Sequence, residues 1–511
     1  MNVTASPDAV QIGIAEWRAA IGESNVLEST QALEAVATAT FPTLQKVLAI
    51  LHPASPEQVG ECMRIAGRCG VPLYPVSAGC NWGLGSRVPA VDGCAVLDLG
   101  RMNAIVAFDP RMGTLTVEPG VTFRQVQDYL RQAGRQWFLP AIGGPADASV
   151  IGNLAERGDG SGPTGDRAGN ACALQVVLPD GSRITTGFGM FDGASMATLS
   201  RTGPGPSLDG LFLQSGMGVL VGATLFLSPV LAHLALVRAH LTGRESLVRT
   251  IDTARALVRD GVLQPNCLSL WNATKVYMQG RSYPWAEMEG KTPLPIATDD
   301  AAQVWYLVAT LHSASPAIGG ARAAHAASAL AASGVIVQVS DEADDPNLRE
   351  QAEGALGGVS DLTAASVYWR KKSAPPSPLR PEADNCGVQW ICLALRLDGT
   401  DFADVTRLIE RTAIEHGFEA VISGFVASPR AIHLFVAIIY DRDIAHEDAA
   451  AQKCHDLVLT MLAERGIHPM RLGIQSMDHL SRAAEPYKSV MRRIRQALDP
   501  HRQVAPGRYE M

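Results

Sequence analysis

The sequence lacks the features of several protein classes. Its nine cysteines include no CxxC pair, which argues against a disulfide scaffold and against a zinc ribbon. It has 43 Lys and Arg against 51 Asp and Glu, and the net charge of −8 disfavours nucleic acid, because phosphate binding needs a basic surface. No apolar run approaches the roughly 20 residues that a membrane-spanning helix needs. We therefore expect no metal site, no nucleic-acid partner and no membrane span.

The N-terminus also lacks the charged start and the apolar run of a secretory signal. Together with the absence of a disulfide pattern, this predicts a cytoplasmic protein. What the chain does have is material for burial, because 511 residues with 47% apolar content suffice for two or more domains. A small molecule is then the expected partner, and a homodimer is left open.

The order of helix and strand signals divides the chain in two. Up to residue 230, short strands alternate with short helices, and Ser55-Pro56 and the capping box Thr122–Gln125 mark two helix starts. From 231 to 480, helical stretches alternate with isolated strands, which predicts a second, α+β domain with a helix-covered sheet. A last helix ends at Asp499-Pro500.

Three glycine-rich loops suggest a nucleotide site. Pro75–Gly83 directly follows a predicted strand, and Ser149–Asn153 and Ser215–Val219 are similar in composition. Small residues let successive backbone N–H groups converge on a phosphate, since no Cβ blocks the approach. Taken singly, each loop could equally be an ordinary tight turn.

None of these loops fits a known local fingerprint. The GxGxxG pattern between a strand and a helix is missing, and so is the P-loop pattern. A nucleotide site built from these loops would therefore be assembled from segments that lie far apart in the sequence.

Taken in order, these loops and their neighbours resemble a known family. The matching stretches are Ser77 to Gly83, Val96-Leu97-Asp98-Leu99, Val117-Glu118-Pro119-Gly120-Val121, Ser149 to Asn153, Gln214 to Val219, and Asp499-Pro500 with Ala505-Pro506-Gly507-Arg508. They resemble FAD-dependent flavoproteins of the vanillyl-alcohol oxidase and p-cresol methylhydroxylase (PCMH) family. The resemblance implies an α+β fold, with a PCMH-type FAD-binding domain of two α/β subdomains and an α+β cap domain whose antiparallel sheet is covered by helices.

The resemblance also implies domain boundaries and a cofactor. A helical segment would span 1–40, the FAD-binding domain 41–230, the substrate-binding cap 231–480, and a C-terminal return to the FAD-binding domain 481–511. FAD would be held by Pro75, Val76, Ser77, Ala78, Gly79, Cys80, Asn81, Ser149, Gly152, Asn153, Gly216, Gly218, Val219 and Arg508. Arg508 would lie near the flavin or its phosphates, where one arginine and backbone dipoles can balance two charges. The alternative for Arg508 is a solvated terminal residue.

The sequence departs from the phenol oxidases of this family, which bind a phenolate with tyrosines and an arginine. The tyrosine positions fall on Leu84, Ser161 and Met470, whereas the arginine is kept as Arg471. Three lost hydroxyls remove donors worth about 1.5–3 kcal/mol each to a bound phenolate. A simple para-alkylphenol is therefore not the expected substrate.

Four residues are candidates for catalysis. Arg471, Trp390 and Gln475 match segments that line the family's substrate cavity. Arg471 could hold a carboxylate, a phenolate or the charge of reduced flavin, or form a structural salt bridge. Trp390 could stack on an apolar substrate or belong to the core. The family's catalytic acidic position falls on Gly144, and Asp147 could replace it or be an exposed loop residue.

Covalent attachment of the flavin is a separate question. The family's tethering histidine falls on Leu434, next to His433, and adjacent strand residues point to opposite faces. Cys80 occupies the loop position at which berberine-bridge-type relatives carry a flavin-linked histidine. A thiolate at Cys80, favoured by converging N–H groups, could form a similar bond. The alternative is a small buried cysteine that lines the loop.

The resemblance implies an FAD-linked oxidase or dehydrogenase that moves a hydride from a small organic substrate to flavin N5. An alcohol, an amine or a hydroxy acid would suit Arg471, and the electron acceptor is not specified. Two alternatives stay open. One is a flavoprotein-fold module that binds a ligand without oxidising it, and the other is an FAD enzyme for a non-oxidative or cyclising biosynthetic step.

Overall fold

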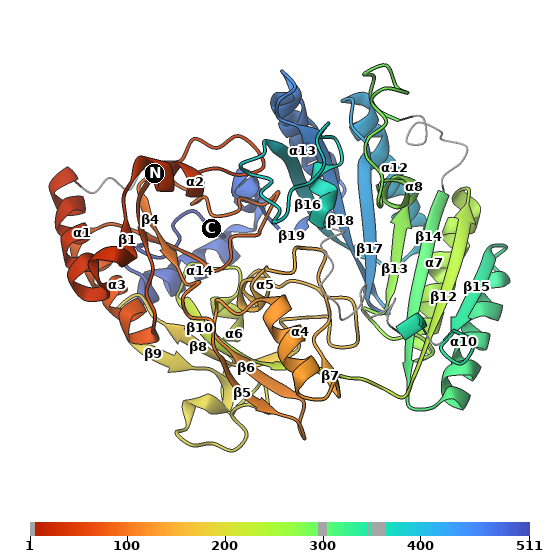
Figure 1. Cartoon of the computed structure of the whole chain (residues 1–511), viewed down its shortest axis with the longest axis horizontal. Helices are drawn as coiled ribbons and strands as arrows, with labels where there is room; N and C mark the ends of the chain where they lie inside the picture. The colour runs from red at the N-terminus through yellow and green to blue at the C-terminus, as the bar shows by residue number, and fades with distance from the viewer. Residues whose placement is uncertain (1–5, 295–303, 346, 350–363) are drawn as a thin grey trace.

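The computed structural model describes residues 6–294, 304–345, 347–349 and 364–511. The chain forms two halves (Figure 1), one built on two small sheets and the other on one large sheet. Helices and sheets are both present in each half, so the predicted α+β class is confirmed.

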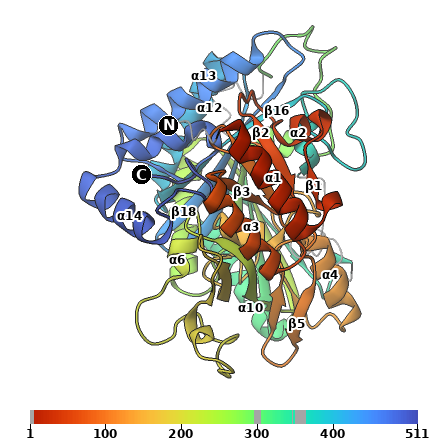
Figure 2. The same ribbon diagram turned by 90° about the vertical axis from the view of Figure 1, so that its left-hand side faces the viewer.

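The first sheet has the strand order β1-β2-β4-β3, and β2, β4 and β3 run parallel. Helices α1 (Pro7–Ile21) and α3 (Pro56–Cys69) lie against it (Figure 2). The start of α3 is as predicted, because the Ser55 side chain accepts a hydrogen bond from the Gln58 N–H. The other elements are β1 (Val26–Leu27), α2 (Thr30–Val36), β2 (Val47–Leu51), β3 (Leu73–Val76) and β4 (Cys94–Asp98).

The second sheet is antiparallel, with the order β5-β6-β10-β8-β9. The predicted capping box is present at the start of α4, where the Thr122 and Gln125 side chains bond to each other's backbone. The elements are β5 (Ile105–Asp109), β6 (Thr114–Val117), α4 (Phe123–Gln132), α5 (Val150–Ala155), β8 (Ala171–Val177), β9 (Arg183–Thr185), α6 (Asp209–Phe212) and β10 (Val219–Phe226), and β7 (Trp137–Phe138) pairs separately with β11 (Ser228–Pro229).

The large sheet has eight strands in the order β15-β12-β14-β13-β17-β18-β16-β19. Four helices cover one face, and alternate residues of β16 such as Leu393 are buried against them, whereas Trp390 and Cys392 point to the other face. The strands are β12 (His233–Thr242), β13 (Leu268–Asn272), β14 (Val304–Ser313), β15 (Ile336–Asp341), β16 (Cys386–Arg396), β17 (Ala420–Ser428), β18 (Ala431–Asp441) and β19 (Pro469–Arg471). The helices are α7 (Arg244–Arg259), α10 (Pro316–Ala331), α12 (Gly399–Glu415) and α13 (Glu447–Ala463), with the short α8 (Ala273–Tyr277) beside β13.

After the large sheet the chain returns to the first half. Helix α14 (Glu485–Leu498) ends where Asp499-Pro500 predicts. Val504 then pairs with Leu73 of β3, and the Leu73 backbone bonds to Gln503 and Ala505. The C-terminus therefore lies among the N-terminal elements (Figure 1).

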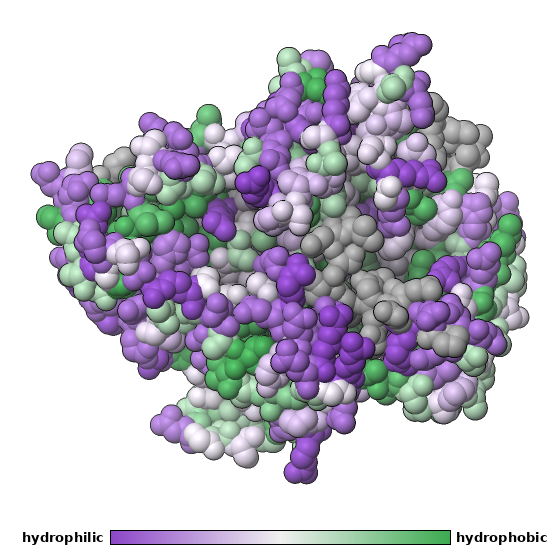
Figure 3. Space-filling model, viewed as in Figure 1, coloured by the Kyte–Doolittle hydropathy of each residue, from purple (hydrophilic) through white to green (hydrophobic). Residues whose placement is uncertain are grey.

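The surface is mixed in character. Figure 3 shows polar side chains over much of one face, with separate rather than continuous apolar patches. Within the described ranges, no helix combines the length and the apolar character needed to cross a membrane.

Candidate active site

Two of the glycine-rich loops meet at the C-terminal end of β3. Gly79 has a φ of +73°, and a Cβ there would lie 2.3 Å from the Arg87 side chain. A Cβ on Gly152 would lie 3.7 Å from the Ser77 Oγ, so the loops at 75–81 and 149–153 are neighbours in space. The structure thus brings together segments that are more than 70 residues apart in the sequence, as the resemblance implies.

The second loop is held by its own polar residues. Ser149 accepts a hydrogen bond from the Gly152 N–H at 2.8 Å and donates one to the Pro119 carbonyl at 2.6 Å. Asn153 accepts a hydrogen bond from Arg167, which is fully buried. These bonds fix the backbone of the loop before any ligand binds.

The third loop packs against the C-terminal return. A Cβ on Gly216 would lie 2.4 Å from the Val504 carbonyl oxygen, and one on Gly218 would lie 2.6 Å from the Val176 side chain. Val219 begins β10, and its side chain is buried in the core. Close packing therefore explains these glycines, and their contact with a cofactor stays a prediction.

Arg508 is buried rather than a solvated terminal residue. Its guanidinium forms an ion pair of 2.6 Å with Glu156, which follows α5. Burial alone would lower the pKa of Arg508, but the Glu156 carboxylate outweighs this and raises it. The second terminal nitrogen, Nη1, is buried and has no hydrogen-bond partner among the described residues. It is a donor that a bound anion can satisfy.

Tyr509 joins the two halves of the molecule. Its hydroxyl donates to the Glu156 carboxylate at 2.9 Å and accepts from the Leu472 N–H, next to β19, at 3.1 Å. Burial, and then the Glu156 charge, raise the pKa of Tyr509, so the phenol stays protonated. Gln214 donates to the same hydroxyl at 3.3 Å.

Arg471 ends β19 and reaches the same cluster. Its Nε donates to the Glu156 backbone carbonyl at 3.1 Å. Its Nη2 is buried without a hydrogen-bond partner, and within the described part of the chain Arg471 forms no ion pair. Glu156 is already paired with Arg508, so the positive charge of Arg471 is not balanced there.

Trp390 and Gln475 meet at Gly83, the last residue of the first glycine-rich loop. The Gly83 carbonyl accepts hydrogen bonds from the backbone N–H of Trp390 at 3.2 Å and from the side-chain Nε2 of Gln475 at 3.1 Å. A Cβ on Gly83 would lie 2.3 Å from the Trp390 ring. Next to Gly83, the Leu84 carbonyl accepts from the Ile474 N–H at 3.0 Å. Three of the four predicted catalytic residues, Arg471, Trp390 and Gln475, thus lie along one junction of the two halves.

Asp147, the fourth, lies in a different setting. Its carboxylate is exposed and forms an ion pair of 2.7 Å with Arg124 at the start of α4. The Asp147 carboxylate is thus engaged with Arg124 at the surface, away from the junction that holds the other three residues. A catalytic role for Asp147 stays a prediction that this geometry does not favour.

The residues named for flavin attachment are also placed. Cys80 is half-buried, with its sulfur 3.6 Å from the Ala78 carbonyl oxygen. Leu434 lies in the helix-covered core, whereas His433 points to the other face of β18 and forms a 2.8 Å hydrogen bond with Asp159. A tether at Cys80 stays a prediction.

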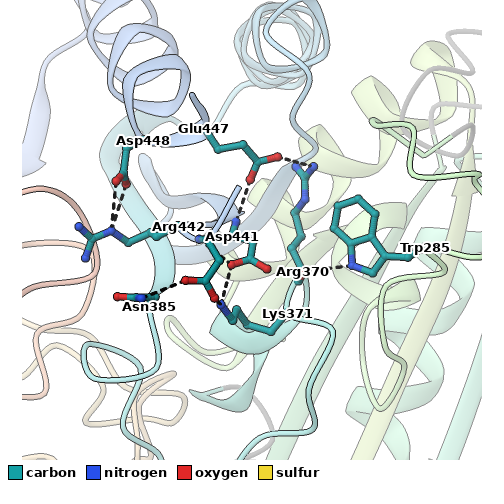
Figure 4. A network of polar contacts seen from close by, with 9 residues as sticks. Trp285, Arg370, Lys371, Asn385, Asp441, Arg442, Glu447 and Asp448 are labelled. Atoms are coloured by element: carbon teal, nitrogen blue, oxygen red, sulfur yellow. Dashed lines mark hydrogen bonds and ion pairs between the residues drawn. The ribbon is translucent and has the colours of Figure 1, made fainter. Parts of the chain in front are cut away.

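A second cluster of charged residues lies beside the end of β18, and its members form ion pairs with one another (Figure 4). Arg370 lies 3.2 Å from Glu447, and Lys371 lies 2.6 Å from Asp441. Arg370 also lies 3.5 Å from Glu419. The Trp285 indole donates to the Arg370 carbonyl at 3.0 Å. This cluster braces the segment before β16 against α13.

Sequence reasoning missed Glu156 and Tyr509. Glu156 lies three residues after a predicted cofactor loop, and Tyr509 follows Arg508 directly. An acidic residue beside a phosphate loop and a tyrosine beside a predicted cofactor arginine were available as signals. The contact between Glu156 and Tyr509 could not be predicted from the sequence, because they are 353 positions apart.

These residues fit the cofactor that the resemblance implies. The loops at 75–81 and 149–153 supply close backbone approach, and Arg508 and Arg471 each offer a buried, unsatisfied N–H donor. FAD carries two phosphate charges and gains a further negative charge on reduction, which matches such donors.

Comparison with known proteins gives the same picture. A family model described as an FAD binding domain matches residues 47–187. The chain is 37% identical to the 1'-carboxy-chondrochloren decarboxylase of Chondromyces crocatus, over 97% of this chain and 96% of that protein. It is 26% identical to the flavoprotein subunit of 4-cresol dehydrogenase (hydroxylating) from Pseudomonas putida, over 97% and 94%. The crystal structure of p-cresol methylhydroxylase with substrate bound superposes with a TM-score of 0.90 at 22% identity, over 100% of this chain and 98% of that one.

Proposed function

Given that the chain belongs to the FAD-dependent vanillyl-alcohol oxidase and p-cresol methylhydroxylase family, we propose that it is an oxidase or dehydrogenase of a small organic anion. When bound, FAD accepts a hydride at N5, a chemistry that no side chain of the chain supplies. The protein's part is to bind the substrate, to orient its reacting carbon and to balance charge.

The observation that carries this proposal is the unbalanced charge of Arg471. Its Nη2 is buried and unsatisfied, and its only described hydrogen bond goes to the Glu156 carbonyl. A guanidinium nitrogen that is buried without a partner is costly, and a carboxylate brought by a substrate would remove that cost with a charge-assisted hydrogen bond. A hydroxy acid, or another substrate with an anionic group, is therefore preferred over a neutral one.

The same face of the large sheet carries aromatic side chains that suit an apolar substrate. On the face of the large sheet opposite the helices, Trp271, Phe425, Phe435 and Trp390 are all partly exposed. The Phe425 and Phe435 rings meet edge-to-face at 5.9 Å. Aromatic side chains left outside the core offer a stacking surface for an aryl group.

A phenol is not the favoured aryl group. Leu84, Ser161 and Met470 stand at the positions of the family's tyrosines, and none of them carries a phenolic hydroxyl. The nearby Tyr509 hydroxyl is committed to Glu156 and Leu472. A phenolate would therefore meet Arg471 alone.

Anaerobic mixing of the holoprotein with three compounds tests the proposal. We expect 3-phenyllactate, an aryl hydroxy acid, to bleach the visible absorbance of the flavin. Its neutral counterpart, 3-phenylpropane-1,2-diol, should do so about 10- to 150-fold less efficiently, the equivalent of one charge-assisted bond, and 4-cresol should react less still. If no aryl alcohol, amine or hydroxy acid reduces the flavin, the oxidase role is refuted and the ligand-binding flavoprotein is favoured.

Decarboxylation is the second candidate, favoured by the full-length similarity to a protein named as a decarboxylase. The aromatic wall described above supports it as well, because a poorly solvated carboxylate loses carbon dioxide more readily. Measuring carbon dioxide release against flavin reduction for each carboxylate substrate separates the two. Reduction without carbon dioxide supports the first candidate, carbon dioxide without reduction supports a non-oxidative decarboxylase, and equal amounts indicate both in one turnover.

A further inference from the structure

His433 lies on the face of the large sheet that meets the FAD-binding half. In β18 it is paired with Phe425 of β17 and Ala394 of β16, and residues paired in register share a face. Its neighbour Leu434 is fully buried under the helices, so the alternation of the strand directs the imidazole away from the core.

Asp159 holds this imidazole in one orientation. Its carboxylate, only 10% exposed, lies 2.8 Å from His433 Nδ1. A carboxylate only accepts hydrogen bonds, so in the neutral imidazole Nδ1 carries the proton and Nε2 carries the lone pair. The His433 side chain keeps 23% of its surface exposed, and Nε2 makes no hydrogen bond to the described residues.

The loop that carries Asp159 is held by contacts between its own backbone groups. Asp159 pairs with Asp166 across the loop, and the Gly158 carbonyl accepts the Arg167 N–H. Arg167 itself is fully buried; burial lowers its pKa to about 10, whereas Asp159 and Asp166 act to raise it. Arg167 therefore lies close enough to Asp159 and Asp166 to interact with both carboxylates.

His433 and Arg471 belong to the same face of the sheet. Cys392 of β16 is opposite Arg471 of β19 on one side and opposite Phe435 of β18 on the other. With strands about 4.8 Å apart and a rise of about 3.4 Å per residue, the Cα atoms of Arg471 and His433 are on the order of 12 Å apart. Burial raises the pKa of Cys392, between them, to about 11, so a neutral thiol separates the two groups.

We propose that His433, positioned by Asp159, is the base that takes a proton from the substrate. The proposal rests on the proposed oxidase function. In a hydroxy acid the C–H hydrogen would leave with its electron pair as a hydride, which bound FAD would accept, while the O–H proton passes to His433 Nε2 and the carbon–oxygen bond becomes a carbonyl. The substrate loses two electrons and two protons in total. The spacing lets Arg471 hold a carboxylate while His433 reaches the hydroxyl.

A purely structural bridge between the two halves is the competing role, and His433→Asn separates the two. The Asn amide nitrogen replaces Nδ1 and can still donate to Asp159, but nothing replaces Nε2. We expect the variant to keep its FAD content, its melting temperature and its dissociation constant for 3-phenyllactate within about twofold. Its rate of flavin reduction should fall about 10²- to 10⁴-fold. His416→Asn, at the C-terminal end of α12, is the matched control and should behave as wild type.

The pH profile gives a second readout. The wild-type reduction rate should fall as pH is lowered through one ionisation, because the base must be neutral, and His433→Asn should lose this dependence. The charged groups around the pair are Asp159, Asp166 and Arg167 of the loop, with Glu156 and Arg471 near Cys392. A wild-type rate and profile in His433→Asn would overturn the proposal, and so would loss of FAD or of folding in both His433→Asn and Asp159→Asn.

A third readout needs no turnover. Nitrogen-15 NMR of labelled histidine at high pH should show the His433 proton on Nδ1, and Asp159→Asn should change this tautomer. A proton on Nε2 in the wild type would overturn the proposal. If the tautomer is as expected but no substrate reduces the flavin, the proposed function fails instead, so the two failures are distinguishable.

Discussion

Two arginines of the large-sheet half, Arg370 and Arg471, show how charge balance separates a structural role from a functional one. Arg370 is fully buried, with the Glu447 carboxylate at 3.2 Å (Figure 4). The Glu419 carboxylate lies at 3.5 Å. Arg471 also has a buried guanidinium nitrogen, but within the described residues it has no ion-pair partner. A cation neutralised inside the fold stabilises the fold, whereas one left unbalanced is available to a ligand.

The surroundings differ in the same way. The Arg370 guanidinium lies 5.1 Å from the centre of the Tyr283 ring and 5.5 Å from that of Trp285, so apolar groups close the space around it. Arg471 lies at the junction of the two halves, beside Glu156 and Tyr509. Sequence alone gives both residues the same type and sign, and only their neighbours distinguish them.

Arg370→Ala should give the largest effect. It leaves Glu419 and Glu447 buried without their cation, and breaking such a pair costs about 3–5 kcal/mol of unfolding free energy. Urea titration followed by tryptophan fluorescence measures the loss. Lys372→Ala, an exposed residue over the Trp285 ring, is the control and should cost under about 1 kcal/mol. Equal losses in the two variants would remove the distinction between Arg370 and Arg471.

Arg471→Met should have the opposite pattern of effects to Arg370→Ala, with little loss of stability and a clear loss of anion binding. Removal of an unbalanced charge should leave the urea midpoint nearly unchanged, because no buried carboxylate loses its partner. Binding of 3-phenylpropionate, measured by calorimetry, should weaken about 10- to 150-fold, the equivalent of about 1.5–3 kcal/mol. The neutral 3-phenylpropionamide should bind equally to both proteins. A destabilisation as large as that of Arg370→Ala would make Arg471 a structural residue.

Gly79→Ala tests the FAD-binding half. A residue with a side chain at a φ of +73° costs about 1–2 kcal/mol, and the new Cβ would displace Arg87. We expect FAD to bind about 5- to 30-fold more weakly, seen as a lower ratio of flavin to protein absorbance. Gly70→Ala has a similar φ of +65° but open space around it, so it should reduce stability without reducing flavin content. Flavin loss in both variants would indicate general strain.

Cys80→Ala should have the smallest effect on stability, and it decides how the cofactor is held. If Cys80 forms a thioether with the flavin, acid-precipitated wild type gives a yellow pellet and the variant a colourless one. A yellow pellet from the variant would disprove the bond. A colourless pellet from both would leave the backbone loops, Arg508 and other noncovalent contacts to hold FAD.

Local signals predicted much of the fold. The N-cap at Ser55, the capping box at Thr122 and the stop at Asp499 each depend on residues within one helical turn, and all three are confirmed. Strands β13 and β17 were not predicted. β13 pairs with β14, more than 30 residues away, and with β17, more than 150 residues away, whereas β17 pairs with β18 directly after a short turn. Sheet order is a non-local property that periodicity does not encode.

The candidate site was predictable in part, because some of its residues lie in local sequence motifs and others depend on contacts between distant segments. The ordered motifs pointed to Arg471, Trp390, Gln475 and Arg508, and the structure places each of them at the junction or beside it. Asp147 was chosen for its closeness in sequence to Gly144, but its position is set by Arg124, on another element. No sequence pattern shows that Asp147 will pair with Arg124 and so lie away from the other candidate residues.

The return of residues 499–510 to β3 has a consequence for biosynthesis. The Glu156 side chain bonds to Arg508 and to Tyr509. The ribosome synthesises both of these residues only after the whole large sheet. The nascent first half therefore emerges with an open seam beside β3 and an unpaired Glu156 carboxylate, and the seam closes only after Tyr509 has left the exit tunnel.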